Sequence, residues 1–182
     1  MNLYLTFKFF ILKIISRFLS KKIAIERSNV GLKKAATIGV MYSYEAPAKH
    51  EIVQRFIREL KNLDKKVIVV CYTTEKDRVY PSSSLLYAFG HEAITAFGKI
   101  KNDRIQKFID VSFDYLFHVD METNPVLDYI IAHNRAKCRV GHFDPMRRSL
   151  FEVMVKVRRT IPIEDMKRLT HQMLHYTGCM ES

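Results

Sequence analysis

The segment Lys66–Tyr72 reads KVIVVCY, a run of β-branched and other apolar residues without polar alternation. A strand with this pattern is buried on both faces, as in a parallel sheet covered by helices. Upstream, Ala36–Tyr42 reads ATIGVMY and has the length of a second buried strand. Between the two strands Pro47 stands in a first helical turn, and apolar residues follow at helical spacing. These apolar residues are Ile52, Val53, Phe56, Ile57, Leu60 and Leu63. The segments together predict a βαβ unit.

Further elements extend outward from this unit. Residues 73–102 are turn-rich, and we expect a short strand near Leu85–Phe89 and another near Ile94–Phe97. After them we expect a helix capped by Asn102 or Asp103, a strand over 113–120, a helix opening at Asn124-Pro125, a strand over 138–143, an edge strand over 151–157 and a last helix from Pro162 to Gly178. Alternation of this kind predicts a three-layer, Rossmann-like α/β domain with a mostly parallel sheet. We place this single domain at 35–178, followed by a tail over 179–182.

Charge is concentrated before that domain. The chain of 182 residues has 30 Lys and Arg against 19 Asp and Glu, a formal charge of +11. Residues 1–34 contain eight basic residues and one acidic residue, a net charge of +7. With 48% hydrophobic and 27% charged residues the composition is globular rather than disordered. The basic excess therefore characterises the N-terminal segment more than the domain.

Residues 1–34 predict a basic amphipathic helix followed by a polar connector. One helical face gathers Leu3, Phe7, Phe10, Ile11, Ile14, Ile15 and Phe18, and Lys13, Ser16, Arg17 and Ser20 are expected opposite. Two interpretations stay open: the apolar face docks on its own domain or a partner protein, or it enters an anionic membrane surface. The contact residues would be Phe7, Phe10, Ile11, Ile14 and Phe18, with Lys13, Arg17, Lys21 and Lys22.

The same sequence argues against secretion and membrane spanning. The apolar run Phe9–Leu19 is interrupted by Lys13 and Arg17, is shorter than the roughly 20 residues of a membrane span, and lacks a cleavage site. Cys71, Cys138 and Cys179 show no CxxC spacing, so neither a disulfide framework nor a zinc site is expected. We therefore expect a cytoplasmic protein.

Motifs for catalysis are absent from the sequence. The first strand continues into MYSYEAPAK, which lacks the glycine-rich loops that bind phosphates, so no nucleotide cofactor is expected. His171 and His175 have a metal-ligand spacing but no accompanying Glu, so no metal site is expected either. We expect no catalytic residues.

Weaker signals point to binding. His118 and Asp120 close one strand, Arg139 and His142 lie on the next, and these four are candidate ligand-binding residues at the sheet edge. A second basic group consists of Arg147, Arg148, Arg158 and Arg159. It could follow RNA phosphates, but no nucleic-acid motif accompanies it and acidic residues are interleaved, which favours a solvated face.

Several stretches resemble a known family. They are KKAATIGVMY (33–42), TAFGKIKNDRIQKFID (95–110) and FDYLFHVDMETNPVLDYIIAHNRAKCRVGHFDP (113–145). The chain resembles small bacterial proteins defined only by a domain of unknown function, through the FGK turn at 97–99, the FDYL strand at 113–116, Asn124 and the AKCRVG strand at 136–141. It is more distantly similar to the N-terminal half of heptosyltransferase-type glycosyltransferases, at 114–120 and 136–141. That likeness implies a Rossmann-like half-enzyme without the C-terminal half that holds most sugar-nucleotide contacts.

These observations favour a non-catalytic binding or scaffold protein that docks on a protein partner or on the inner membrane surface through its basic helix. One alternative is a glycosyltransferase-like domain that binds a sugar or sugar nucleotide. The other alternative is an RNA- or ribosome-associated protein.

Overall fold

The computed structural model describes residues 3–22, 28, 31–74 and 86–180. Six of its strands form one sheet in the order β3-β2-β1-β4-β5-β6, and every neighbouring pair is parallel. The strands are β1 (Thr37–Ser43), β2 (Lys66–Tyr72), β3 (Leu86–Phe89), β4 (Tyr115–His118), β5 (Cys138–His142) and β6 (Val153–Val155). The helices are α1 (Leu3–Lys22), α2 (Pro47–Asn62), α3 (Asp103–Asp110), α4 (Pro125–His133) and α5 (Pro162–Cys179), with 3-10 turns η1 (His91–Ala93) and η2 (Pro145–Arg147).

The expected βαβ unit is confirmed. β1 and β2 pair in parallel with Thr37 beside Lys66, and α2 connects them. The strand order is that of the Rossmann fold, in which the chain reverses direction across the sheet between β1 and β4. The predicted Rossmann-like α/β class is therefore confirmed.

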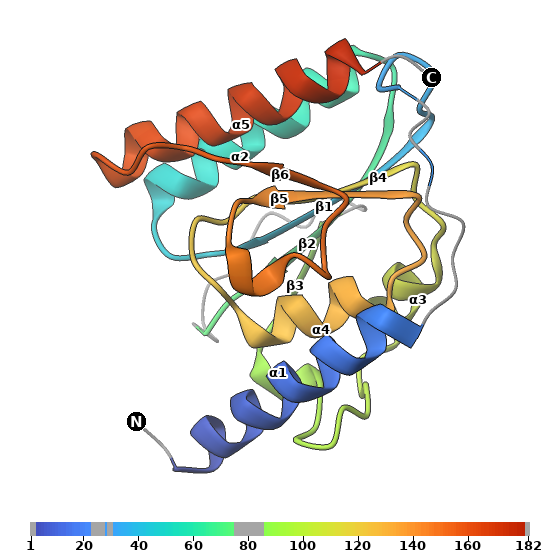
Figure 1. Cartoon of the computed structure of the whole chain (residues 1–182), viewed down its shortest axis with the longest axis vertical. Coiled ribbons are helices and arrows are strands. Elements are labelled where there is room, and N and C mark those ends of the chain that lie inside the picture. The colour runs from blue at the N-terminus through green and yellow to red at the C-terminus, as the bar shows by residue number, and fades with distance from the viewer. Residues whose placement is uncertain (1–2, 23–27, 29–30, 75–85, 181–182) are drawn as a thin grey trace.

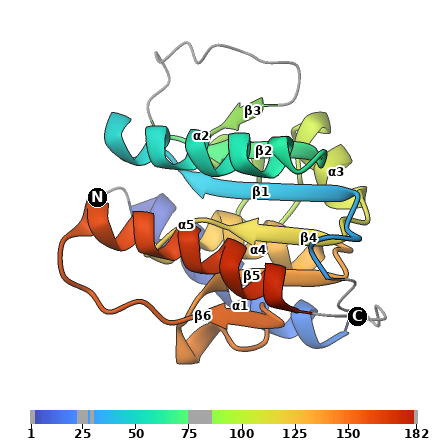
Figure 2. The ribbon, with the colours of Figure 1, turned by 90° about the horizontal axis from the view of Figure 1, so that it is seen from above.

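Helices cover both faces of the sheet in three layers. α2 and α5 lie over one face and α3 and α4 over the other (Figure 1, Figure 2). Side chains such as Phe56 and Leu169 form one core, and Phe108 and Ile130 belong to the second. α1 packs along α4 on the side that faces away from the sheet.

Asparagine caps begin two helices where the sequence places them. Asn102 Oδ1 accepts hydrogen bonds from the N–H groups of Arg104 and Ile105 at the start of α3. Asn124 Oδ1 accepts from Val126 N–H at 3.0 Å, and Pro125 takes the first helical position of α4. Both caps satisfy N–H groups that have no partner within the helix itself.

Some elements differ from the expectations. No strand covers Ile94–Phe97: Ile94 and Ile100 form an isolated antiparallel bridge around a turn. The edge strand β6 is shorter than expected. Helix α5 does not end at Gly178 but continues to Cys179, because glycine can also adopt the α-helical backbone conformation. Leu32, expected in the connector, is buried in the core. The turn-rich stretch 75–85 lies outside the described residues.

Candidate functional site

The carboxyl edge of the sheet between β1 and β4 is where Rossmann folds bind ligands. Here Asp120 fills that position and is 1% exposed. Its carboxylate accepts hydrogen bonds from Ser43 N–H at 2.9 and 3.1 Å and from Ser43 Oγ at 3.1 Å, and it forms an ion pair with Lys49 Nζ. Lys49 also contacts Glu45 at 2.8 Å, and Asn124 Nδ2 donates to Ser43 Oγ at 3.1 Å. The Asp120 carboxylate is therefore engaged by groups of the protein itself.

Electrostatics at this position reflect burial. Burial raises the pKa of Asp120 to about 6, although Lys49 and the Ser43 N–H favour the carboxylate and oppose that shift.

The connection from β1 to α2 has no glycine, so its backbone lacks the tight turn with which related folds approach a pyrophosphate. This edge is arranged as a buried ion pair that fixes β1, α2 and β4 together.

His118 lies beside that ion pair. It is fully buried, and its Nε2 is 3.4 Å from Asp120 Oδ2. Among the described residues neither ring nitrogen has a hydrogen-bond partner. Burial, followed by the nearby charges of Arg147 and Lys49, holds the pKa of His118 well below its usual range. The buried site therefore favours the neutral imidazole.

His142 lies at the end of the neighbouring strand β5. It lines a pocket of about 270 Å³ with Met121, Glu122, Thr123, Phe143, Asp144, Pro145, Arg147 and Arg159. Burial lowers the pKa of His142, and Arg159 and Arg147 lower it further. The structure thus brings His118 and Asp120 into contact and places His142 on an adjacent polar pocket.

Arg139 lies apart from these three. Its Nε and Nη2 donate to Glu152 at 3.0 and 2.7 Å, and its guanidinium also approaches the carbonyls of Ile131 and Ser149. Arg139 is 3% exposed and does not line the pocket beside His142. It joins β5 to the residue that precedes β6, so it acts within the fold.

The second basic group is divided by its ion pairs. Arg147 is buried, forms an ion pair with Asp128 and lies over the Phe151 ring, 4.9 Å from its centroid. Arg159 pairs with Glu122 at 2.8 Å, whereas Arg148 and Arg158 are exposed. Burial and pairing therefore remove one of the four arginines from the surface and partly neutralise another.

The two histidines on α5 that have the spacing of metal ligands are not part of a metal site in the described part of the chain. His171 and His175 are both exposed. Over residues 3–22, 28, 31–74 and 86–180, no three or more His, Cys, Asp or Glu side chains are grouped so as to hold a metal ion.

α1 presents two apolar faces. On one, Leu12 is fully buried, Ser16 is 2% exposed, and Lys8 is 2% exposed with its Nζ donating to the His91 carbonyl. Burial lowers the pKa of Lys8, Glu92 opposes that shift and Lys101 adds to it. This face docks α1 on α4 and η1, so Ser16 faces the domain rather than solvent.

The opposite side of α1, here called the outer face, is solvent-exposed. It consists of Leu3, Phe7, Phe10, Ile14 and Phe18, which are 85%, 51%, 61%, 36% and 70% exposed. Lys13 and Arg17 are exposed along its flank, and Ile11 is half-buried. Lys21 and Lys22 continue the helix, and their side chains lie outside the description. The outer face therefore contains five of the seven residues of the predicted apolar stripe, whereas Ile11 is half-buried and Ile15 packs against the core.

No described helix is long and apolar enough to cross a membrane.

Fold and site define a Rossmann-like α/β protein with a buried ion pair at the carboxyl edge of its sheet and an exposed apolar helix face. The chain belongs to the family of unknown function DUF6913, whose model matches residues 8–179. The fold is similar to the solved structure of E. coli heptosyltransferase WaaC with ADP, with a TM-score of 0.50 and 7% sequence identity. The match covers 80% of this chain and 48% of that one, so this chain spans about half the length of that protein. Comparison with curated proteins gives no match.

Proposed function

We propose that this protein is a binding module that attaches to an anionic membrane surface through the outer face of α1. The observation that carries the proposal is that α1 is already docked on its own domain through Lys8, Leu12 and Ser16, yet leaves the outer face exposed. Exposed apolar patches of this extent on a folded domain mark interaction sites. The apolar face is thus available for a partner without any rearrangement of the helix.

Charge favours lipid over protein as the occupant. α1 contains no acidic residue, and Lys13 and Arg17 border the apolar stripe. This is the pattern of helices that lie in the plane of a bilayer, with Phe and Leu at the acyl boundary and cations at the headgroups. Each basic residue near an anionic surface contributes about 1 kcal/mol, and full burial of a Phe or Leu contributes about 1.5–3 kcal/mol.

Co-sedimentation with vesicles tests the proposal. The intact protein should bind phosphatidylglycerol vesicles, bind phosphatidylcholine vesicles weakly, and lose affinity as salt rises. A Phe7→Ser/Phe10→Ser/Phe18→Ser variant should bind about a hundredfold more weakly or worse. The matched control is Leu63→Ser/Ile161→Ser, since these side chains are 51% and 61% exposed and lie outside α1.

The outcomes separate the possible occupants. Equal vesicle binding by the triple variant and the control would disprove attachment through the outer face. Absence of vesicle binding together with dimerisation that the triple variant abolishes would assign this face to a second copy of the chain.

A second candidate function is binding of a sugar or sugar nucleotide at the pocket beside His142. The observation that favours it is the polar lining at the ends of β4 and β5, with arginine, carboxylate and imidazole groups around about 270 Å³. A thermal-shift screen with sugar nucleotides and free sugars is the test. A stabilisation that His142→Ala abolishes would support this candidate, and the absence of any shift would count against it.

RNA or ribosome association stays a prediction from the two basic segments. Salt-sensitive RNA binding by the intact protein, lost on Arg148→Gln/Arg158→Gln, would support it.

A further inference from the structure

The FGK turn (97–99), together with Thr95 and Ala96 before it, presents an exposed aromatic side chain. Phe97 is 83% exposed, nearly as much as Leu3 on the outer face. Lys99 and Lys101 follow it and are also exposed. An aromatic residue at the tip of a turn, with two lysines in the segment that follows it, has the composition of a lipid-contacting loop.

Hydrogen bonds hold the FGK turn in a fixed shape. Thr95 N–H donates to the Lys99 carbonyl at 2.8 Å, Gly98 N–H to the Thr95 carbonyl at 3.1 Å, and Lys99 N–H to Thr95 Oγ1 at 3.0 Å. Gly98 has φ +80°, a conformation that favours glycine. A Cβ on Gly98 would also come within 2.7 Å of the Tyr129 hydroxyl oxygen. The exposure of Phe97 is thus imposed by an ordered turn.

α4 and α1 fix the position of this turn. Tyr129 Oη on α4 donates to the Gly98 carbonyl at 2.6 Å. Lys101 N–H donates to the Ala93 carbonyl at 2.7 Å, and the adjacent His91 carbonyl accepts from Lys8 on α1. The base of the turn and the docked face of α1 therefore meet at η1.

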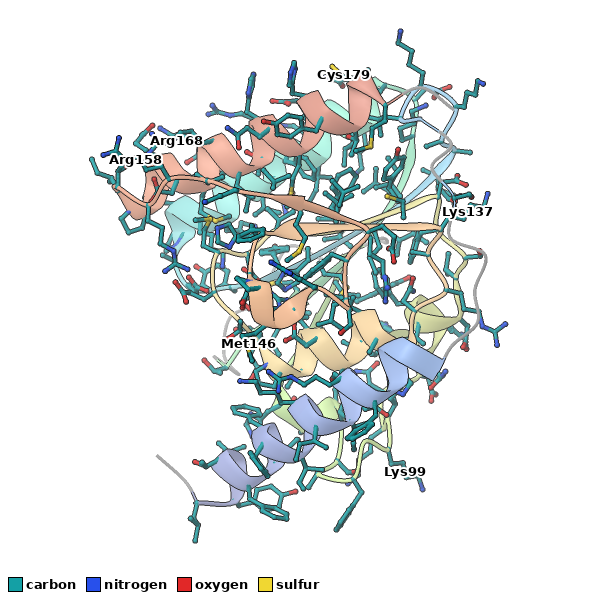
Figure 3. All side chains as sticks on the ribbon, viewed as in Figure 1. Lys99, Lys137, Met146, Arg158, Arg168 and Cys179 are labelled. Atoms are coloured by element: carbon teal, nitrogen blue, oxygen red, sulfur yellow. The ribbon has the colours of Figure 1, made fainter. Side chains whose placement is uncertain are left out.

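The turn and α1 lie at the same end of the molecule. Figure 1 shows the segment between η1 and α3 projecting beside α1, away from the sheet. Figure 3 labels Lys99 at this end, whereas Cys179, Arg158 and Arg168 are labelled at the α5 side. Two separate elements at this end of the molecule therefore expose apolar side chains with cations nearby.

We infer that the FGK turn is a second membrane-contact element, in which Phe97 enters the acyl boundary and Lys99 and Lys101 bind the phosphates of anionic glycerophospholipids. The inference rests on the proposed attachment through α1. α1 alone would allow the domain to rotate about the helix axis, because one helix defines one line of contact. A second contact outside that line fixes the orientation of the domain on the membrane.

Single-tryptophan fluorescence tests the inference, because the chain contains no tryptophan. Three variants carry one probe each: Phe97→Trp on the turn, Phe10→Trp on α1, and Ile161→Trp as the control outside both elements. With phosphatidylglycerol vesicles that contain brominated acyl chains, the probes at 97 and 10 should shift to the blue and be quenched. The probe at 161 should not change.

The outcomes distinguish this inference from the function on which it rests. Quenching at position 10 without quenching at 97 overturns the role of the FGK turn and leaves attachment through α1 intact. Absence of quenching at both positions overturns the two proposals together.

An affinity measurement gives an independent result. Phe97→Ser should weaken binding to phosphatidylglycerol vesicles about tenfold while α1 is unchanged. Lys99→Glu should weaken it and reduce its salt dependence, whereas Ile161→Ser should have no effect. Unchanged affinity in both turn variants, with circular dichroism showing a folded protein, would contradict the inference.

Discussion

Asp114 connects the beginnings of three strands. Its carboxylate accepts hydrogen bonds from Ala36 N–H at 2.8 Å and Thr37 N–H at 3.0 Å, and Lys137 Nζ lies 2.8 Å away. Burial alone would raise the pKa of Asp114, but the Lys137 side chain and the Thr37 and Ala36 N–H groups lower it to about 2. The carboxylate is therefore more favourable in the folded protein than in the unfolded chain.

Asp114→Asn should lower the free energy of unfolding at pH 7 by about 2 kcal/mol, since one pKa unit corresponds to about 1.4 kcal/mol. Because the folded pKa is depressed, this contribution is complete above the ordinary pKa near 3.8 and is lost as pH falls toward 2. Urea unfolding at pH 7, 4 and 2.5 measures it. The difference between the variant and the wild type should shrink to about a third of its pH 7 value at pH 2.5, whereas the exposed control Glu51→Gln should follow the wild type throughout. A constant difference at all three pH values would contradict this assignment.

Lys49 and Asp120 form the second charged contact on which the fold depends. Both side chains are nearly inaccessible to solvent, so removal of one leaves the other without compensation. We expect Lys49→Met to lower the free energy of unfolding by about 3 kcal/mol, as broken buried ion pairs do. In that background Asp120→Asn should restore part of the loss, because it removes the unpaired carboxyl. A double-mutant cycle by urea unfolding measures the coupling, and additive losses would show that the two groups act separately.

Charged residues whose ion-pair partners lie far away along the chain limit how much of the site can be predicted from the sequence. The placement of His118 and Asp120 at a strand end followed from the sequence FHVD at 117–120, but Lys49, which pairs with Asp120, lies 71 residues from it along the chain. Similarly, Arg139 and Arg147 have the composition of a binding surface. Only the fold brings Glu152 and Asp128 to them and turns both into internal ion pairs. Pairings across sheet and helix have no local signal.

α4 and α1 depend on each other. Residues from Val126 to Ala132 are buried without exception, although one side of α4 faces away from the sheet. A helix that is buried all round needs cover on both sides, and α1 supplies the second cover. Helical periodicity predicted that α1 forms, but its apolar residues surround it on more than one side. The docked face is the one that packs on α4 through Leu12 and Ser16 and on η1 through Lys8.

A matched pair of substitutions on α1 tests this division of faces. Leu12 is fully buried, so Leu12→Ala should lower the free energy of unfolding by about 2–4 kcal/mol. Phe10 is 61% exposed, so Phe10→Ala should change it by no more than about 0.5 kcal/mol. Thermal or urea unfolding of both variants provides the measurement. The reverse order of effects would mean that α1 docks through its outer face.

At the scale of the molecule, the two elements that we propose to contact the membrane share one end. α1 and the FGK turn lie at one end, and α5, which bears Cys179, lies at the other (Figure 3). The spacing of apolar residues predicted the helices and strands, and their alternation predicted the three layers, because each helix and strand has its own local pattern. It did not place the FGK turn beside α1, since that neighbourhood depends on contacts from Tyr129 and Lys8.

The arrangement predicts the orientation of the membrane-bound protein. Cys179 is exposed, whereas Cys71 and Cys138 are buried, so a thiol-reactive dye should label Cys179 selectively. On phosphatidylglycerol vesicles with an acceptor dye at the headgroups, energy transfer from this site should be weak because α5 faces away from the bilayer. In a Cys179→Ser background, Lys99→Cys should give strong transfer, since the FGK turn lies at the surface. Comparable transfer from both sites would mean that the domain tumbles on a single helix. Strong transfer from Cys179 alone would place α5, rather than α1, against the lipid.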